Sequence, residues 1–488
     1  MPSLRHEIRF LLNETPVTVS EAAPDTTLLS FLRLERRLTG SKEGCAEGDC
    51  GACTVMVGRL AGGELVYEAV TSCIRLLPSL DGCHVVTVEH LSRDGGLHPI
   101  QQALVDAHGS QCGFCTPGIA MALYALWLRS PAPGVTEIER ALQGNLCRCT
   151  GYQPIVDAAL SLPRYGTPDA DPLAMGRAAV QQQLAAWQDG ARVELAHGDA
   201  RAILPADGDD FAAALADNAG ATIVAGATDV GLWVTKRFQA ISPAIFIGHL
   251  AGLQQVEAEE AGLRLGAGIS YAQALPHLLD RFPHLAELWW RIGGDQIRSM
   301  GTIGGNIANG SPIGDTPPAF IALAATLTLR SRRGARTLPL EDFFIAYGRQ
   351  DRGADEFVES VFLPYPEPGR HDAAYKLSKR RDEDISAVCG AFSLRLEGET
   401  VAALRIAYGG MAATPRRAAA VEAALLGRPW SAASLAGAAT AFDADFQPIG
   451  DWRASADYRR TAARNLLRRF HLQTTGMAGL RLSRETAA

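Results

Sequence analysis

The stretch Gly44-Cys45-Ala46-Glu47-Gly48-Asp49-Cys50-Gly51-Ala52-Cys53 decides the fold of the N-terminal part of this chain. Its three cysteines have C-x4-C-x2-C spacing, and a fourth, Cys73, follows the next predicted hairpin. This spacing is typical of a [2Fe–2S] cluster held by four thiolates. An anionic cluster needs soft sulfur ligands and backbone N–H groups aimed at its sulfurs, and glycines let the chain wrap closely around it. A structural zinc site is the alternative, but it usually consists of two C-x2-C pairs.

A second set of four cysteines combines a C-x2-C pair, Cys112 and Cys115, with a C-x-C pair, Cys147 and Cys149. Both pairs are predicted to lie at helix starts, where N–H groups and the helix dipole favour anionic ligands. On spacing alone this set fits a second cluster, and zinc stays an alternative. The two remaining cysteines, Cys83 and Cys389, have no partner by spacing, and a lone cysteine is most often a small buried hydrophobic residue.

Composition limits the class of protein. The 488 residues suffice for about three domains, and 47% hydrophobic with 20% charged residues exclude a disordered, collagen-like or coiled-coil chain. The net charge of −7 disfavours binding to nucleic acid. The longest apolar stretches, 118–128 and 319–327, are shorter than the roughly 18 residues of a spanning helix, and the N-terminus has no signal-peptide pattern. We expect a cytoplasmic protein with no membrane or nucleic-acid partner, in a compartment that keeps thiols reduced.

The pattern of hydrophobic and turn-forming residues changes several times along the chain. Up to residue 91 it predicts strands, with a hairpin turn at Asn13-Glu14 and one helix over 27–38. Four helices are then expected, the third starting at a capping box of Thr136 and Glu139. A segment rich in Pro, Gly and Asp predicts a linker. Beyond it, β-rich runs alternate with glycine-rich turns, and strands followed by Ala-rich helices close the chain. The four helices are expected over 99–108, 117–129, 136–142 and 154–162.

Two glycine-containing loops, about 75 residues apart, suggest a phosphate-bearing ligand. Thr302-Ile303-Gly304-Gly305-Asn306 offers consecutive backbone donors without obstructing side chains. Thr228, in the earlier loop, and Asp315 could hydrogen-bond a ribose or a ring, although loop capping is the alternative for each. Gly266-Ala267-Gly268 lacks the third glycine of a Rossmann fingerprint, so a dinucleotide would have to bind without that fold.

Several of these segments resemble the molybdenum hydroxylases. Gln111–Gly118 (QCGFCTPG) and Asn145–Tyr152 (NLCRCTGY) are similar to the second iron–sulfur domain of that family, and Gly44–Cys53 to its ferredoxin-like domain. Residues 223–230 (IVAGATDV) and 301–315 (GTIGGNIANGSPIGD) are similar to its two flavin loops. KLSKRRDEDI at 376–385 and YGGM at 408–411 match its closing flavoprotein domain. Within the family, the arrangement is most similar to the small, iron–sulfur/FAD subunit of bacterial xanthine dehydrogenases.

The resemblance implies a multidomain α+β fold. Its parts are a β-grasp, plant-type ferredoxin-like [2Fe–2S] domain over 1–91, a four-helix [2Fe–2S] domain over 92–165, a linker over 166–194, an α+β FAD-binding domain over 195–370 and an α+β flavoprotein C-terminal domain over 371–488. It also implies that Cys45, Cys50, Cys53 and Cys73 hold one cluster and Cys112, Cys115, Cys147 and Cys149 the other.

The resemblance further implies a set of cofactor contacts. Gln111 and Cys149 match residues that face a pterin on a partner chain. Relatives often have an aromatic residue where Ile292 stands, so the packing against the flavin is expected to differ there. A surface position is the alternative for Lys376. The implied FAD contacts are Ile223, Val224, Ala225, Gly226, Ala227, Thr228, Asp229, Val230, Ile292, Thr302, Ile303, Gly304, Gly305, Asn306, Asp315, Val358 and Lys376.

The implied function is electron transfer within a xanthine dehydrogenase. Electrons would pass from a molybdopterin centre on a larger partner chain to the second cluster, the first cluster, FAD and finally NAD⁺, during oxidation of hypoxanthine and xanthine to urate. No substrate-converting residue is then expected in this chain, and the assembly would be a dimer of heterodimers. The alternatives are the same module of another molybdenum hydroxylase, acting on an aldehyde, an N-heterocycle or carbon monoxide, or a stand-alone carrier or zinc scaffold.

Overall fold

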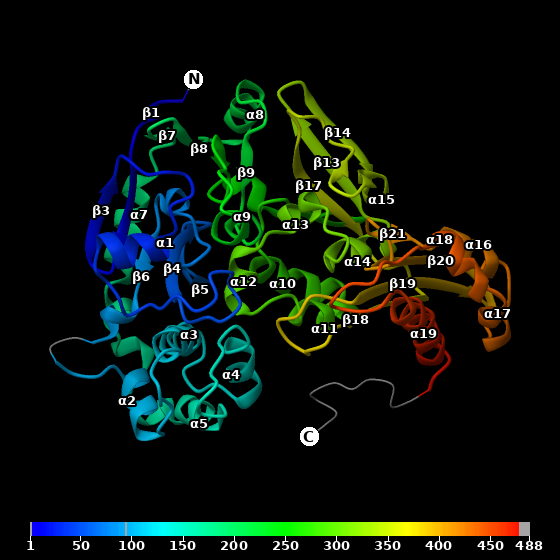
Figure 1. Cartoon of the computed structure of the whole chain (residues 1–488), viewed down its shortest axis with the longest axis horizontal. Helices are drawn as coiled ribbons and strands as arrows, with labels where there is room; N and C mark the ends of the chain where they lie inside the picture. Colours follow the sequence, from blue (N-terminus) through cyan, green and yellow to red (C-terminus); the bar gives the residue numbers. More distant parts are fainter. Residues whose placement is uncertain (1, 93–94, 478–488) are drawn as a thin grey trace. The chain divides into compact units, whose positions relative to one another are not determined.

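The computed structural model describes residues 2–92 and 95–477, which divide into two units (Figure 1). Unit 1 comprises the residues up to Gln254 together with Ser270–Gln273 and Gly293–Thr302. Unit 2 comprises Gln255–Ile269, Ala274–Ile292 and the residues from Ile303 onward. Two short returns of the chain, far from the N-terminus in sequence, therefore complete unit 1.

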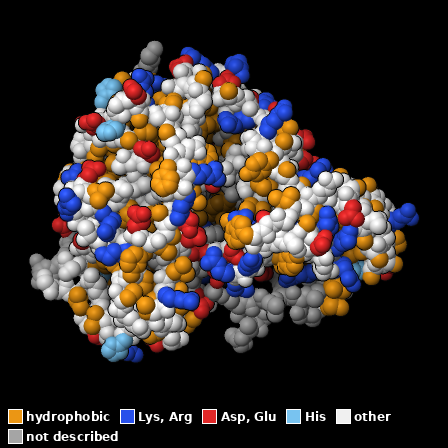
Figure 2. All heavy atoms as spheres, in the orientation of Figure 1, with side chains coloured by type: hydrophobic (Ala, Val, Ile, Leu, Met, Phe, Trp, Pro, Cys, Tyr) orange, Lys and Arg blue, Asp and Glu red, His pale blue; other side chains and the backbone are white. Residues whose placement is uncertain are grey.

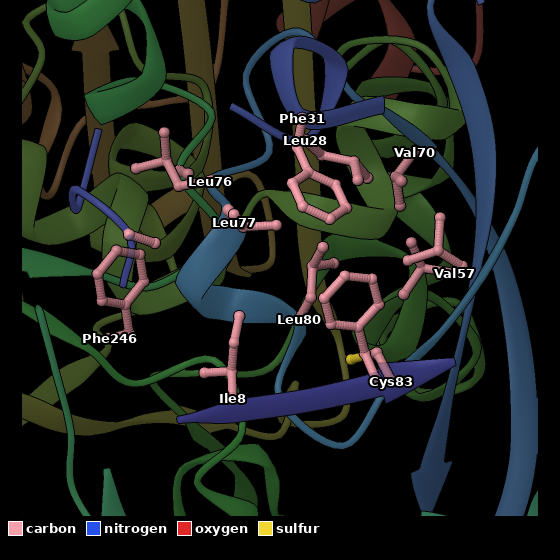
Figure 3. Packing of buried hydrophobic residues seen from close by; sticks show 14 of the residues in the cluster. Ile8, Leu28, Phe31, Val57, Val70, Leu76, Leu77, Leu80, Cys83 and Phe246 are labelled. Carbon is pink, nitrogen blue, oxygen red and sulfur yellow. The ribbon is translucent and has the colours of Figure 1, made fainter. Parts of the chain in front are cut away.

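Unit 1 begins with a five-stranded sheet in the order β3-β2-β6-β4-β5, in which β2 runs parallel to β6 and the other neighbours are antiparallel. This β-grasp arrangement and the hairpin at Asn13 confirm the prediction. One face of the sheet is covered by side chains such as Leu28, Phe31 and Leu80, which Figure 3 shows packed against Ile8 and Val57. The helix expected over 27–38 is α1 (Leu28–Ser30) followed by a wider π-helical turn (Phe31–Glu35). The strands are β2 (Ile8–Leu12), β3 (Thr15–Val19), β4 (Thr54–Ala61), β5 (Glu64–Thr71) and β6 (His84–Val86).

The four predicted helices follow, drawn in cyan to teal in Figure 1. The second of them is central, because its residues from Gly118 to Trp127 are all buried. The predicted capping box is wrong: the third helix starts one residue earlier, and the Gly134 N–H donates to the Glu137 carboxylate at 2.9 Å. Thr136 therefore lies inside the first turn instead of preceding it. The helices are α2 (Pro99–Asp106), α3 (Thr116–Arg129), α4 (Val135–Ala141) and α5 (Gln153–Ser161).

The segment predicted as a linker contains helices α6 (Pro172–Met175) and α7 (Arg177–Trp187). Leu184 of α7 is fully buried in a small apolar cluster with Leu11 and Leu65 of the first sheet. Val180 and Trp187, four residues before and three after Leu184, pack against the same cluster, so the helix has a short apolar face that the linker prediction overlooked.

Unit 1 continues with a second sheet in the order β1-β7-β8-β10-β9. Helices α8, α9 and α12 also belong to this unit. The N-terminal strand is split, because Leu4–Arg5 pairs with β7 while Ile8–Leu12 belongs to the first sheet. The remaining elements of unit 1 are β1 (Leu4–Arg5), β7 (Arg192–His197), β8 (Ala200–Leu204), α8 (Gly208–Asp217), β9 (Thr222–Val224), α9 (Val230–Arg237), β10 (Ala244–Phe246) and α12 (Asp295–Met300).

Unit 2 contains a five-stranded antiparallel sheet, β11-β12-β17-β13-β14, and a four-stranded antiparallel sheet, β18-β19-β20-β21, against which the long helix α19 packs. The strands are β11 (Val256–Ala258), β12 (Gly262–Gly266), β13 (Thr326–Ser331), β14 (Gly334–Pro339), β15 (Phe344–Ala346), β16 (Arg349–Gln350), β17 (Phe357–Pro364), β18 (Arg370–Leu377), β19 (Val388–Glu397), β20 (Thr400–Gly409) and β21 (Arg416–Arg417). The helices are α11 (Ala286–Trp290), α13 (Ile303–Asn309), α14 (Thr316–Ala322), α15 (Leu340–Phe343), α16 (Ala419–Leu425), α17 (Ala432–Gly437), α18 (Phe442–Asp445) and α19 (Ala456–Thr474), and α10 (Tyr271–Arg281) runs from unit 1 into unit 2.

Charged side chains of both signs are interspersed over the face drawn in Figure 2, so this face has no large single-sign field. Among the described residues, no helix has both the length and the apolar character needed to cross a bilayer.

Candidate iron–sulfur and flavin sites

The loop of residues 44–53, called the first cysteine loop from here on, brings its thiols together with Cys73. Cys53 and Cys73 flank the paired strand ends Thr54 and Thr71, which sets them side by side. The Cys45 sulfur accepts hydrogen bonds from the thiols of Cys50 and Cys73, which lowers the pKa of Cys45 and raises the pKa of the other two. The backbone N–H of Cys50 also donates to that sulfur, at 3.4 Å. Four converging thiols with an N–H directed at sulfur match the donors that a [2Fe–2S] cluster requires.

The second cysteine set is more exposed. Cys112 and Cys149 are exposed and hydrogen-bond each other, while Cys115 pairs with Cys147. Burial, followed by the bond to Cys147, raises the pKa of Cys115 to about 12. Cys115 is the N-cap of α3, as predicted, and Cys147 and Cys149 lie in the loop that precedes α5. Within the described ranges, no three His, Cys, Asp or Glu side chains are arranged as for a single metal ion. In the second set the sulfurs approach in two pairs, Cys112 with Cys149 and Cys115 with Cys147.

The two glycine-containing segments meet inside unit 1. A Cβ placed on Gly226, in the first flavin loop (residues 223–230), would lie 1.7 Å from the carbonyl oxygen of Met300. Thr228 Oγ1 would be 3.5 Å from a Cβ on Gly301, at the start of the second flavin loop (residues 301–315). Ala227 between them has a φ of 60°, a conformation that a non-glycine residue rarely adopts. The backbones are thus in direct contact at a position that only glycine allows.

Two helices connect the flavin loops to the first cysteine loop. Helix α9 begins at the last residue of the first flavin loop, Val230, and Thr235 Oγ1 on it donates to the carbonyl of Ala46 at 2.6 Å. Lys236 Nζ donates to the carbonyl of Cys45 at 2.5 Å and lies 3.4 Å from the Glu47 carboxylate. Helix α12 ends at the second flavin loop, and its Ile297 reaches within 2.9 Å of a Cβ placed on Gly48. The first cysteine loop is therefore the direct neighbour of both flavin loops in unit 1.

Four family models match successive parts of the chain. A "2Fe-2S iron-sulfur cluster binding domain" covers residues 10–74 and a "[2Fe-2S] binding domain" covers 87–160. An "FAD binding domain in molybdopterin dehydrogenase" covers 198–366, and a "CO dehydrogenase flavoprotein C-terminal domain" covers 373–474. A solved carbon monoxide dehydrogenase from Hydrogenophaga pseudoflava is 30% identical with a TM-score of 0.53, over 55% of this chain and 94% of that chain. This chain belongs to the molybdenum hydroxylase family.

Curated relatives in the family are larger. The xanthine dehydrogenase of Emericella nidulans is 32% identical over 95% of this chain but only 38% of its own length. The xanthine dehydrogenase/oxidase of Rattus norvegicus is 30% identical over 97% of this chain and 40% of its own length. The chain thus spans less than half of these molybdenum hydroxylases and is an iron–sulfur/FAD electron-transfer module, with two [2Fe–2S] domains and one FAD-binding domain.

Other expected flavin contacts of this module lie in unit 2. A Cβ on Gly304 would be 2.3 Å from the Cβ of Ala267, so the cradle is closely packed there. The buried Oδ1 of Asn306 has no hydrogen-bond partner within the described ranges, so it can accept a bond from a ligand. Gly305 is exposed and Ile303 is buried. These features fit a phosphate-bearing ligand.

Lys376 and Asp315 form a buried ion pair. Lys376 Nζ donates to Asp315 Oδ2 at 2.6 Å and to the carbonyl of Arg291 at 3.0 Å. Ser386 Oγ donates to the other Asp315 oxygen at 2.5 Å. Lys376 is only 7% exposed, so the alternative of a surface lysine is wrong. Val358 is buried in β17, and Ile292 is partly buried.

Sequence reasoning missed Thr235, Lys236 and Gln296, which contact or support the cysteine loops of this family member. Each lies about 150 to 240 positions away from its partners, and none belongs to a recognisable motif. No local signal could have assigned them. Cys83 and Cys389 are buried, as the sequence predicted for lone cysteines.

Proposed function

We propose that this chain is the small subunit of a xanthine dehydrogenase, accepting electrons from a molybdopterin centre on a partner chain and passing them to NAD⁺ during oxidation of hypoxanthine and xanthine to urate. The supporting observation is the arrangement inside unit 1, where the exposed cysteine set is followed by the first cysteine loop and then by the flavin loops. Bound FAD would supply a carrier that collects single electrons and releases a hydride, which clusters cannot do.

The chain's own residues have defined parts in this proposal. The eight cysteines hold the two clusters, and the N–H groups of the first cysteine loop stabilise charge on the sulfurs. In unit 2, the second flavin loop approaches the ligand through Gly304, and Asn306 accepts a hydrogen bond from it. The buried Lys376–Asp315 ion pair joins β18 to the start of α14 and supplies polar groups on this side of the proposed flavin site.

The surface around the second cysteine set supports a partner chain. Phe114, Leu146 and Tyr152 are 46%, 49% and 37% exposed beside exposed Cys112 and Cys149. Large apolar side chains around exposed thiols are costly in water and are typical of a surface that another protein covers. Gln111 is exposed in the same motif, in keeping with its proposed pterin contact.

The eight proposed cluster ligands have to be thiolates and not disulfides, which fits a reducing, cytoplasmic compartment. The second candidate function is the same module in a carbon monoxide dehydrogenase or another molybdenum hydroxylase. It is favoured by the 30% identity to the Hydrogenophaga structure over nearly all of that chain. The xanthine assignment is favoured by similarity over 95% of this chain to a relative of that name.

The test is to co-purify the chain with its molybdenum-binding partner, determine the mass of the assembly and measure iron, molybdenum and FAD. The assembly is then assayed with xanthine, an aldehyde and carbon monoxide, each with NAD⁺ and with oxygen. Xanthine oxidation with NAD⁺ in a dimer of heterodimers supports the proposal. Turnover of only the aldehyde or carbon monoxide refutes the xanthine assignment, and turnover with oxygen but not NAD⁺ refutes the acceptor.

A further inference from the structure

A buried polar network in unit 1 joins the first cysteine loop to residues 144–149, called the second cysteine loop from here on, which carry Cys147 and Cys149. The side chain of Gln296, on α12, donates from Nε2 to Asn145 Oδ1 at 2.8 Å and to Thr54 Oγ1 at 3.2 Å. Asn145 Nδ2 donates in turn to the carbonyl of Gly51 at 3.1 Å, and Thr54 Oγ1 donates to the same carbonyl at 2.6 Å. All three side chains are at most 3% exposed. One glutamine thus bridges residues that belong to two cluster domains.

The backbones of the two domains touch at this network. The N–H of Leu146 donates to the carbonyl of Cys50 at 2.9 Å, so neighbours of two proposed cluster ligands share a hydrogen bond. A Cβ on Gly51 would lie 2.1 Å from the carbonyl oxygen of Gly144, and a Cβ on Gly118 would lie 2.0 Å from that of Gly51. Such contacts leave no free space, so a small displacement here changes the separation of the two loops directly.

The chemistry of Gln296 indicates a role other than stabilisation. Its Oε1 is buried and has no hydrogen-bond partner among the described residues. A buried acceptor without a partner costs about 1–3 kcal/mol, so an apolar side chain of the same length could pack at this position without that cost. Gln296 is a donor shared by Asn145 and Thr54, which also hydrogen-bond each other at 3.4 Å and both donate to the carbonyl of Gly51.

Helix α12 extends the network to the flavin. Ile297 contacts Gly48 of the first cysteine loop, and Thr71 Oγ1 donates to the sulfur of Met300 at 3.5 Å. Met300 is the residue whose carbonyl touches Gly226. The helix that carries Gln296 therefore reaches both cysteine loops on one side and both flavin loops at its end.

We propose that Gln296 is a positioning residue that fixes the separation of the two cluster loops and links both to the flavin loops through α12. This inference rests on the proposed cluster ligands. It goes beyond them by assigning the spacing between the clusters to a side chain that binds neither.

The test uses the full chain with both clusters reduced, and measures the spin–spin splitting between them by electron paramagnetic resonance. Dipolar coupling falls with the cube of the distance, so it reports separation directly. Gln296→Met keeps the length and removes both donated bonds, and Thr54→Val removes, with little change in shape, both the acceptor of the Gln296 bond and the donor to the Gly51 carbonyl. Tyr124→Phe is the matched control, because Tyr124 is equally buried and hydrogen-bonds Asp171 at 2.5 Å, away from the cysteine loops.

We expect a smaller and more widely distributed splitting in both Gln296→Met and Thr54→Val, and the wild-type splitting in Tyr124→Phe. Wild-type splitting in either loop variant that holds both clusters overturns the proposal, as does an equal change in the control. A wild-type chain without two cluster signals would instead refute the cluster assignment on which the inference rests.

Discussion

Replacing Gly226 by alanine tests the contact between the two flavin loops. The new Cβ would be 1.7 Å from the carbonyl oxygen of Met300, and real Cβ atoms essentially never come closer than 3.0 Å to another heavy atom. The loops must therefore separate by about 1.3 Å, the difference between these distances. Neither side can yield easily, because Met300 ends α12 and the N–H of Gly301 is bound to the carbonyl of Ile297 at 2.7 Å.

Overpacking of this kind costs about 1–3 kcal/mol, which corresponds to roughly 5- to 150-fold weaker FAD binding if the loss falls on the ligand-bound state. The assay is titration of the flavin-free chain with FAD, followed by fluorescence, with iron content as a measure of intact clusters. Gly252→Ala is the matched control, since a Cβ there meets no atom within 4 Å. Wild-type FAD affinity in Gly226→Ala would refute the assignment of this contact to the flavin site.

Three further predictions concern single side chains. Burial lowers the pKa of His84 to about 4, so the unfolded chain binds a proton below about pH 6.5 that the folded chain excludes. The free energy of unfolding should therefore fall by up to roughly 3 kcal/mol between about pH 6.5 and pH 4, as measured with urea, and an unchanged slope in His84→Gln would contradict this. Lys236→Met removes a positive charge beside the Cys45 carbonyl and should lower the midpoint potential of the first cluster in a redox titration, whereas Lys236→Arg should retain it. Lys376→Met leaves the buried carboxylate of Asp315 without its cation and should destabilise the chain by about 3–5 kcal/mol in urea unfolding; the double variant with Asp315→Asn should recover stability, and equal loss in both would argue against the pair.

The sequence predicted those features that depend on local chemistry. The C-x4-C-x2-C spacing reflects the geometry that a cluster imposes on its ligands, and α3 is recognisable because its apolar run is continuous. The start of α4 was predicted wrongly, since Gly134 and Glu137 form the cap although Thr136 has the better intrinsic preference. Helix α7 was missed because its apolar pattern, Val180, Leu184 and Trp187, covers only two turns and follows a segment rich in Pro, Gly and Asp that predicts a linker.

The features of the site that the sequence did not predict depend on contacts between residues far apart in the chain. Asp315 and Lys376 each match the family pattern, but only the fold pairs them, 61 positions apart. The same holds for Thr235 and Lys236, whose contacts to the first cysteine loop span about 190 positions. Such side chains belong to no sequence motif, because their contacts are made with residues that the fold brings close and not with their neighbours in sequence.

The attachment of α9 and α12 to the first cysteine loop has a consequence for modularity. The N-terminal domain of this chain has the β-grasp sheet of a ferredoxin, but its cysteine loop is completed by residues near positions 235 and 296. Excision of that domain would leave the carbonyls of Cys45 and Ala46 without their donors on α9, and Thr54 without the bond from Gln296. A functional exchange of this domain between relatives therefore has to include α9 and α12, the two later segments that contact its cysteine loop.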